Sequence, residues 1–139
     1  ALYEKWIAER ENSRELMDER KSVQLALQNM QALGLTGGVI YVDGKLSAFT
    51  IGERIRDDVQ LVHIEKADTD IDGLYPMINQ QYVLHACQDV TYINREEDMG
   101  HAGMRKAKRS YYPAYMVEKY LLSLRDLSEG ASLWGNTEE

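Results

Sequence analysis

The spacing of the apolar residues changes once along this chain, at Gly34. Before this glycine, Val23, Ala26, Met30 and Leu33 recur every three or four residues, which is the period of an amphipathic helix. We therefore expect helix over residues 1–33, broken near residues 12–13. Glycine is favoured just after the last helical residue, so Gly34 is the expected C-cap.

After Gly34 the period becomes that of strands. Two β-prone runs, residues 38–42 and 45–51, flank the pair Asp43-Gly44. An Asp-Gly pair between two such runs is the strongest short-range signal for a β-hairpin. The change from helix to hairpin excludes an all-helical fold.

The elements expected after the hairpin alternate between strand and helix. In order, they are a polar loop over 53–58, a strand over 59–65, a helix opened by the acidic segment 68–73, a strand over 90–94, a basic helix within 101–112 that ends before Pro113, a strand over 114–124 and a loosely held tail over 125–139. A strand–helix–strand unit is normally parallel, whereas a hairpin is antiparallel. The pattern predicts one α/β domain over residues 1–139, with a mixed sheet flanked by helices.

Charge is distributed unevenly along the chain. The net charge of −7 disfavours binding of nucleic acid or anionic lipid by the surface as a whole. Residues 101–112 nevertheless hold four of the 16 lysines and arginines and none of the 23 acidic residues, so the rest of the chain has a net charge of −11. No apolar run reaches the roughly 20 residues of a membrane span.

Cysteine and histidine give no sign of a metal site. The single cysteine, Cys87, excludes an internal disulfide and is expected to be a buried structural thiol. The three histidines have no metal-ligand spacing with it. The segment Asp68-x-Asp70-x-Asp72-Gly73 copies the first half of a calcium loop, but Asn79 stands where a bidentate Glu is required.

Charged and polar residues gather at the ends of the two strands expected at 59–65 and 90–94. They are His63, Glu65 and Lys66 on the first, and Asn94, Arg95, Glu96, Glu97 and Asp98 on the second. Ligands of open α/β sheets bind outside the carboxyl ends of the strands, so this edge is the expected pocket. The alternative is that Glu65–Lys66 and Arg95–Glu96 are surface ion pairs and that Glu97 or Asp98 caps the next helix.

The basic helix has two distinct faces. Met104, Ala107 and Tyr111 share the face expected to point inward. The cations Arg105, Lys106, Lys108 and Arg109 lie on the rest of the helix, where an anion would relieve their mutual repulsion. Phosphate is the expected anion, and the alternative is a solvated face paired with the acidic remainder of the chain.

Several segments, taken in order, match a known family. They are Leu33-Gly34-Leu35, Ala48 to Gly52, His63-Ile64-Glu65-Lys66-Ala67, Gly73-x-Tyr75, Ile78-Asn79, Tyr92 to Gly100 and Arg105 to Pro113. Together they resemble the bacterial family grouped with the C-terminal domain of phosphatidylglycerol lysyltransferase, over about residues 20–120. The resemblance implies an acyl-CoA N-acyltransferase-like (GNAT-like) fold, in the second of two tandem domains.

The resemblance also implies acyl or aminoacyl transfer. Relatives move an aminoacyl group from aminoacyl-tRNA to an amine or hydroxyl acceptor, so aminoacyl-tRNA or another phosphate-bearing substrate is the expected partner, beside a sister GNAT-like domain. Acetyl-CoA is disfavoured, because Asp68, Asp70 and Asp72 stand where acetyl-CoA enzymes present a basic, glycine-rich turn to pyrophosphate. A cytoplasmic location is expected. The alternative is a non-catalytic module that binds tRNA, an anionic metabolite or a partner domain.

These expectations assign a role to each candidate residue. Glu65, Glu96 or His63 would take the acceptor's proton. Arg95 and Lys66, beside Asn94, would hold a phosphate or stabilise a developing oxyanion. The four cations of the basic helix would bind the donor's phosphates, and Tyr111 or Tyr112 would stack on a base.

Overall fold

The computed structural model describes residues 2–4 and 14–120. The chain divides into two compact units, residues 1–100 and 101–139, and each is described by itself. The expected helix break near residues 12–13 and the expected tail over 125–139 lie outside the described residues.

Helix α2 spans Arg14–Gln28, and hydrogen-bonded turns carry the chain on to Gly34. Gly34 has φ 64°. The next amide, that of Leu35, donates a hydrogen bond to the carbonyl of Met30 at 2.8 Å. This bond is typical of a helical segment that ends on a left-handed glycine. The role expected for Gly34 is confirmed, although regular helix stops six residues earlier.

Four strands form one sheet in the order β1-β2-β3-β4. They are β1 (Leu35–Val42), β2 (Lys45–Arg56), β3 (Val59–Ala67) and β4 (Tyr92–Asn94). The first three pair antiparallel, and β4 pairs parallel to β3. The hairpin turn falls at Asp43 (φ 50°) and Gly44 (φ 75°), as predicted.

One loop prediction and one strand prediction differ from the structure. The polar loop expected over 53–58 is strand as far as Arg56, because the backbone there pairs with β3 while the exposed side chains of Arg54 and Arg56 give the segment its polar composition. The strand expected over 114–124 is absent from residues 114–120, and residues 121–124 are outside the described part of the chain. Side chains such as Tyr115 and Val117 are β-prone but exposed, and that preference stabilises a strand only where a sheet partner and a packed face exist.

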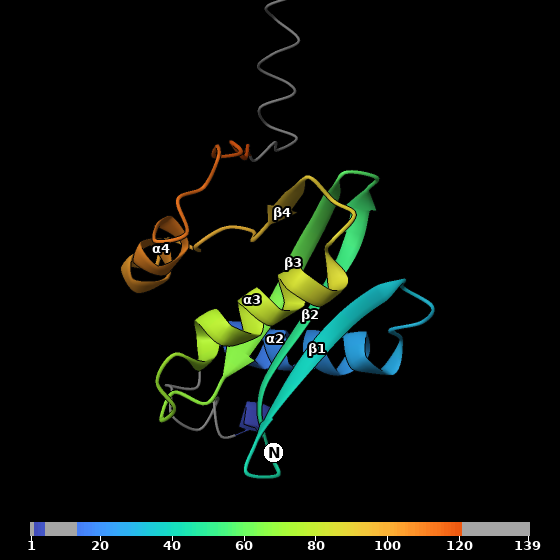
Figure 1. Ribbon diagram of the computed structural model, residues 1–139, viewed down its shortest axis with the longest axis vertical. Coiled ribbons are helices and arrows are strands. Elements are labelled where there is room, and N and C mark those ends of the chain that lie inside the picture. Colours follow the sequence, from blue (N-terminus) through green and yellow to red (C-terminus); the bar gives the residue numbers. More distant parts are fainter. Residues whose placement is uncertain (1, 5–13, 121–139) are drawn as a thin grey trace, which may run out of the picture. The chain divides into compact units, whose positions relative to one another are not determined.

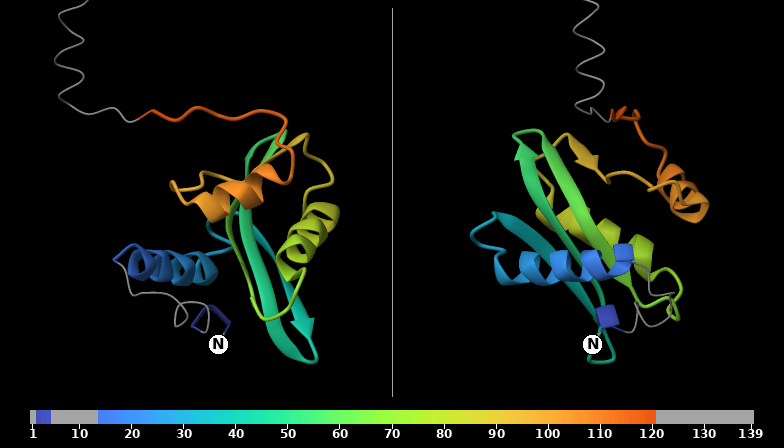
Figure 2. Two further views of the ribbon diagram at one scale, coloured as in Figure 1. Left: turned by 90° about the vertical axis from the view of Figure 1, so that its left-hand side faces the viewer. Right: turned by 180° about the vertical axis from the view of Figure 1, so that it is seen from behind.

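The sheet lies between two helices. Helix α3 (Leu74–Ala86), the helix expected after the acidic segment, packs on one face, and α2 lies on the other (Figures 1 and 2). On the α2 face, Val23 packs with Phe49 and Ile51. On the α3 face, Ile78 packs with Ala48 and Ala67. Both faces of β2 and β3 are therefore buried, and polar side chains on these strands are exceptions in an apolar environment.

The second unit contains helix α4 (Ala102–Arg109), which ends before Pro113 as predicted. The face expected to point inward is not buried: Met104 and Tyr111 are 42% and 41% exposed. An apolar stripe on a helix is buried only where another element packs against it.

Candidate active site

A β-bulge determines which way the candidate residues of β3 point. Ile51 pairs with Ile64, but the next residue of β2, Gly52, pairs with Val62, so His63 is the extra residue of the bulge. Val62 packs with Tyr82 on the α3 face, whereas Ile64 packs with the cluster of Val23 on the α2 face. A bulge re-aims side chains in this way and is common beside active sites.

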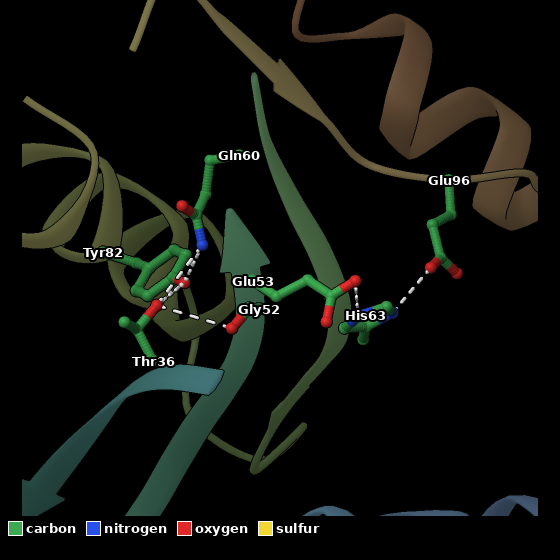
Figure 3. Close-up of polar contacts among 7 residues, drawn as sticks. All are labelled: Thr36, Gly52, Glu53, Gln60, His63, Tyr82 and Glu96. Atoms are coloured by element: carbon green, nitrogen blue, oxygen red, sulfur yellow. Dashed lines mark hydrogen bonds and ion pairs between the residues drawn. The ribbon is translucent and has the colours of Figure 1, made fainter. Parts of the chain in front are cut away.

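His63 lies between two carboxylates (Figure 3). Its Nδ1 is 2.9 Å from Glu96 Oε1, and its Nε2 is 3.5 Å from Glu53 Oε1. An ionised carboxylate can only accept, and the contact with Glu96 is the shorter of the two, so we assign the ring proton to Nδ1. In the neutral ring Nε2 then keeps its lone pair, which is the arrangement that a general base requires. About a third of the His63 side chain, 34%, is exposed.

Glu96 is held by local backbone geometry. Its φ is 55°, in the left-handed region that a non-glycine residue rarely adopts. The side-chain oxygen of Asn94 accepts the Glu96 amide at 2.8 Å, a local bond that stabilises this turn. Strained backbone of this kind gathers at functional sites. In this structure Asn94 orients Glu96, in addition to the binding role expected for it.

Glu65 lies on the opposite face of the sheet from His63. Its Oε1 accepts from Arg95 Nη2 at 2.7 Å, and its Oε2 accepts from Asn79 Nδ2 at 3.1 Å. Its side chain is only 9% exposed. The sequence places His63 and Glu65 two residues apart, but the structure brings Glu96 to His63 and Arg95 to Glu65.

Lys66 points back to the α2 face. Its ammonium is 2.6 Å from Glu19 Oε1 on α2, and its side chain is 12% exposed. The ion pairs considered as an alternative, Glu65–Lys66 and Arg95–Glu96, are replaced by pairs with different partners. Asp98 also does not cap α4: it accepts the Gly100 amide, and the N-cap of the helix is His101.

A hollow of about 410 Å³ opens beside His63 on the α2 face. Its wall is mostly apolar, with polar groups from α2, β2 and β3; the lining residues are Glu19, Ser22, Ala26, Leu33, Leu35, Ile51, Glu53, His63 and Ile64. Small-molecule sites have volumes of roughly 300–1,000 Å³ and this same composition. The hollow and His63 therefore form the candidate active site.

A buried polar network holds the bulge from the α3 side. The hydroxyl of Tyr82 lies 2.7 Å from Thr36 Oγ1 and accepts from Gln60 Nε2 at 2.9 Å (Figure 3). Thr36 Oγ1 also lies 3.4 Å from the carbonyl oxygen of Gly52. Burial raises the pKa of Tyr82, while its hydrogen bonds to Thr36 and Gln60 act in the opposite direction. The network ties three strands and α3 together at the bulge.

The acidic segment before α3 is organised within the protein. Asp68 is buried, its Oδ2 lies 3.5 Å from Lys45 Nζ, and its Oδ1 accepts the Asp70 amide. The α3 N-cap is Gly73, without a side-chain cap. Across the described residues no group of three or more His, Cys, Asp or Glu side chains is arranged to hold a metal ion.

Cys87 is buried, as expected, and burial raises the pKa of its thiol.

The basic segment belongs to the second unit. Arg105, Lys106 and Arg109 are exposed on α4, and Lys108 is half-buried. The helix has three basic residues in its last turn and no acidic residue in its first. This arrangement presents several cations on one short helix, as the sequence indicated.

Comparison with known proteins identifies the family. The family model described as phosphatidylglycerol lysyltransferase, C-terminal, matches residues 1–123. The chain belongs to this family. The resemblance inferred from the ordered motifs is therefore confirmed.

Two solved structures are similar to this family member. A conserved protein of unknown function from Bacteroides thetaiotaomicron VPI-5482 is 48% identical, with a TM-score of 0.72 over 75% of this chain and 35% of that one. The chain thus spans about a third of that relative's length. A ribosomal-protein-alanine N-acetyltransferase from Brucella melitensis biovar Abortus 2308 is 15% identical, with a TM-score of 0.58 over 72% of this chain and 78% of that one.

The second structure confirms the GNAT-like fold predicted from the sequence. No curated protein matches the chain. None of the helices in the described part of the chain is both long and apolar enough to cross a membrane.

Sequence reasoning missed the partners that complete the site. Glu53 falls in the segment predicted as a polar loop, and Glu19 and Tyr82 fall in segments predicted as helices, where nothing in the sequence marks them as site residues. One signal for Glu53 was available: Gly52 interrupts a β-prone run, and a glycine inside a strand often marks a bulge.

Proposed function

We propose that the chain catalyses acyl transfer, with His63 as the general base. The observation that carries this proposal is the position of His63: its Nδ1 is oriented by Glu96 and its Nε2 faces Glu53 at the hollow. A base held by a second group is the arrangement that activates a nucleophile in many transferases and hydrolases. The carboxylates of Glu96 and Glu53 would balance the positive charge on the ring after proton transfer.

Glu65 has a structural role in this proposal. Its carboxylate is buried, paired with Arg95 and hydrogen-bonded to Asn79, so it is poorly placed to receive a proton from a substrate on the α2 face. Lys66, bound to Glu19, shapes the wall of the hollow.

The donor in this proposal is an aminoacyl ester of tRNA. Exposed cations on α4 support it, because phosphate contacts by Arg and Lys dominate nucleic-acid affinity. The acidic segment 68–73 disfavours coenzyme A, whose pyrophosphate would meet the carboxylates of Asp70 and Asp72. Aminoacyl-tRNA is a cytoplasmic donor, so the proposal includes a cytoplasmic location. It also includes a sister domain in a longer chain, which would complete the tandem arrangement typical of the family.

The proposal is tested with aminoacyl-tRNA whose aminoacyl group is radiolabelled. Hydroxylamine serves as a generic acceptor, and the readout is labelled hydroxamate formed above the rate without protein. Acetyl-CoA is the parallel donor. Hydroxamate from aminoacyl-tRNA supports the proposal. Binding of tRNA without turnover would leave the chain a non-catalytic module, and turnover with acetyl-CoA alone would contradict the donor assignment.

A double substitution tests the donor site separately. Arg105→Ala with Arg109→Ala should weaken tRNA binding and lower the slope of log affinity against log salt by about 1.4–1.8, since each phosphate contact contributes about 0.7–0.9. An unchanged affinity and slope in a filter-binding series would exclude α4 as the donor-binding helix.

A further inference from the structure

We propose that the hollow beside His63 binds the acceptor, and that this acceptor is a primary amine on a small apolar body, bound as its ammonium ion. The inference rests on the proposed function, since it takes His63 as the base. It adds the chemical class of the acceptor. Acyl transfer by itself does not determine whether the acceptor is an amine or a hydroxyl, or whether it is a cation or an anion.

Charge around the hollow favours a cation. Its two lining carboxylates are Glu19 and Glu53, and Glu96 stands on the far side of the His63 ring. Lys66 lies against Glu19 and offsets that one charge. Among the described residues the remaining local charge is negative, so a phosphate or carboxylate close to the reacting atom would be repelled. An anionic lipid headgroup is therefore a poor occupant.

The geometry between His63 and Glu53 accommodates a bridging donor. With the proton on Nδ1, Nε2 and Glu53 Oε1 are two acceptors that face each other across 3.5 Å. Two acceptors do not bond to each other, and the separation exceeds that of an ordinary hydrogen bond. An ammonium group has three donors and could donate to both atoms at once. A hydroxyl has one proton and would satisfy only one of them.

The rest of the hollow suits a short apolar body. Leu33, Leu35, Ile51 and Ile64 line it, together with Ala26. Its volume of about 410 Å³ is near the lower end of the range for small-molecule sites. An acceptor of about the size of a short alkyl chain would bury its carbons there and leave its nitrogen beside Nε2.

The reaction balances with these groups alone. The ammonium gives one proton to Nε2, and the free amine attacks the carbonyl carbon of the donor ester. A C–N bond forms and the ester C–O bond breaks. The imidazolium returns its proton to the leaving oxygen, and the second proton on nitrogen passes to solvent. The products are an amide and the donor's free hydroxyl.

The test compares three probes of equal length on the complete chain: n-hexylamine, 1-hexanol and hexanoate. Titration followed by NMR of the methyl groups should place hexylamine at Ile51 and Ile64. Hexanoate should bind at least about tenfold more weakly, because charge-assisted bonds to a carboxylate are lost and repulsion takes their place. Glu53→Gln should bring hexylamine to about the affinity of hexanol. Asp57→Asn, a change of an exposed carboxylate in the turn between β2 and β3, should leave it unchanged.

The two proposals can fail separately. Equal binding of hexylamine and hexanoate, shifts confined to other residues, or no hexylamine binding would overturn the acceptor inference while leaving hydroxamate formation intact. Selective hexylamine binding that depends on Glu53, in a protein without transfer activity, would support the amine site and contradict the transferase.

Discussion

The hydroxyl of Tyr82 lies where a side chain at residue 52 would be. A Cβ on Gly52 would be 2.7 Å from that hydroxyl and 2.2 Å from the carbonyl oxygen of Leu61. Neither neighbour can move freely, because the first is hydrogen-bonded to Gln60 and the second is backbone of β3. The glycine thus allows α3 to reach the strands at the bulge that exposes His63.

Gly52→Ala should destabilise the fold by about 2–4 kcal/mol, since an added methyl group would overpack a rigid site. The measurement is urea denaturation followed by circular dichroism. Gly103→Ala is the matched control, because nothing lies within 4 Å of a Cβ there and alanine favours the helix. Equal stability of the Gly52 variant and the wild type would contradict the close packing of Tyr82 and Leu61 against residue 52.

Tyr82→Phe should lower the free energy of unfolding by about 1–2 kcal/mol, because Gln60 and Thr36 lose a buried partner. The effect depends on pH. Burial raises the pKa of Tyr82, so the unfolded chain ionises this group at lower pH than the folded one. The advantage of wild type over the variant should be constant below the ordinary tyrosine pKa of about 10 and shrink as pH rises above it. A difference in the free energy of unfolding that grows as pH rises would contradict this prediction.

Arg95→Met should cost about 3 kcal/mol or more, because it leaves the Glu65 carboxylate buried without its cation. The exposed ion pair of Arg54 and Asp89 provides the comparison: Arg54→Met should cost less than about 1 kcal/mol. Thermal unfolding of both variants measures the contrast. Similar small losses for both would indicate that Glu65 is available for chemistry after all.

Cys87 should resist alkylation in the native protein. The thiol is buried and burial raises its pKa, so little thiolate is present near neutral pH. Iodoacetamide labelling followed by mass spectrometry should show slow modification in buffer and rapid modification in urea. Rapid labelling of the native protein would assign Cys87 to a reactive site.

The order of the secondary-structure elements can be predicted from the sequence more reliably than the face of the sheet on which each side chain lies. The Asp43-Gly44 turn and the helical stripe before Gly34 are local signals. The turn is confirmed, and the helix is confirmed over Arg14–Gln28, with hydrogen-bonded turns from there to Gly34. Strict alternation along β3 would place His63 and Glu65 on one face. The bulge separates them, and it depends on contacts with Gly52 and Tyr82 that lie far away in the sequence.

The partners of the charged residues were equally difficult to predict. Residues 94–98 offer several possible partners for the side chains of β3. Their actual pairing with His63 and Glu65 follows from where β4 stops pairing with β3, at Asn94 opposite Leu61. The left-handed backbone of Glu96 and its bond to Asn94 then decide which carboxylate reaches the ring. Tertiary contacts thus decide which charged residues pair, and the composition of the segment does not predict those contacts.

The most direct test of the account compares two histidine variants in the hydroxamate assay with aminoacyl-tRNA. His63→Gln should lower kcat by about 10²–10⁴-fold, the usual contribution of a general base, without loss of stability. His85→Gln, a change on the exposed side of α3, should keep full activity. The account predicts this difference between the two. Wild-type activity in the stable His63 variant would contradict it.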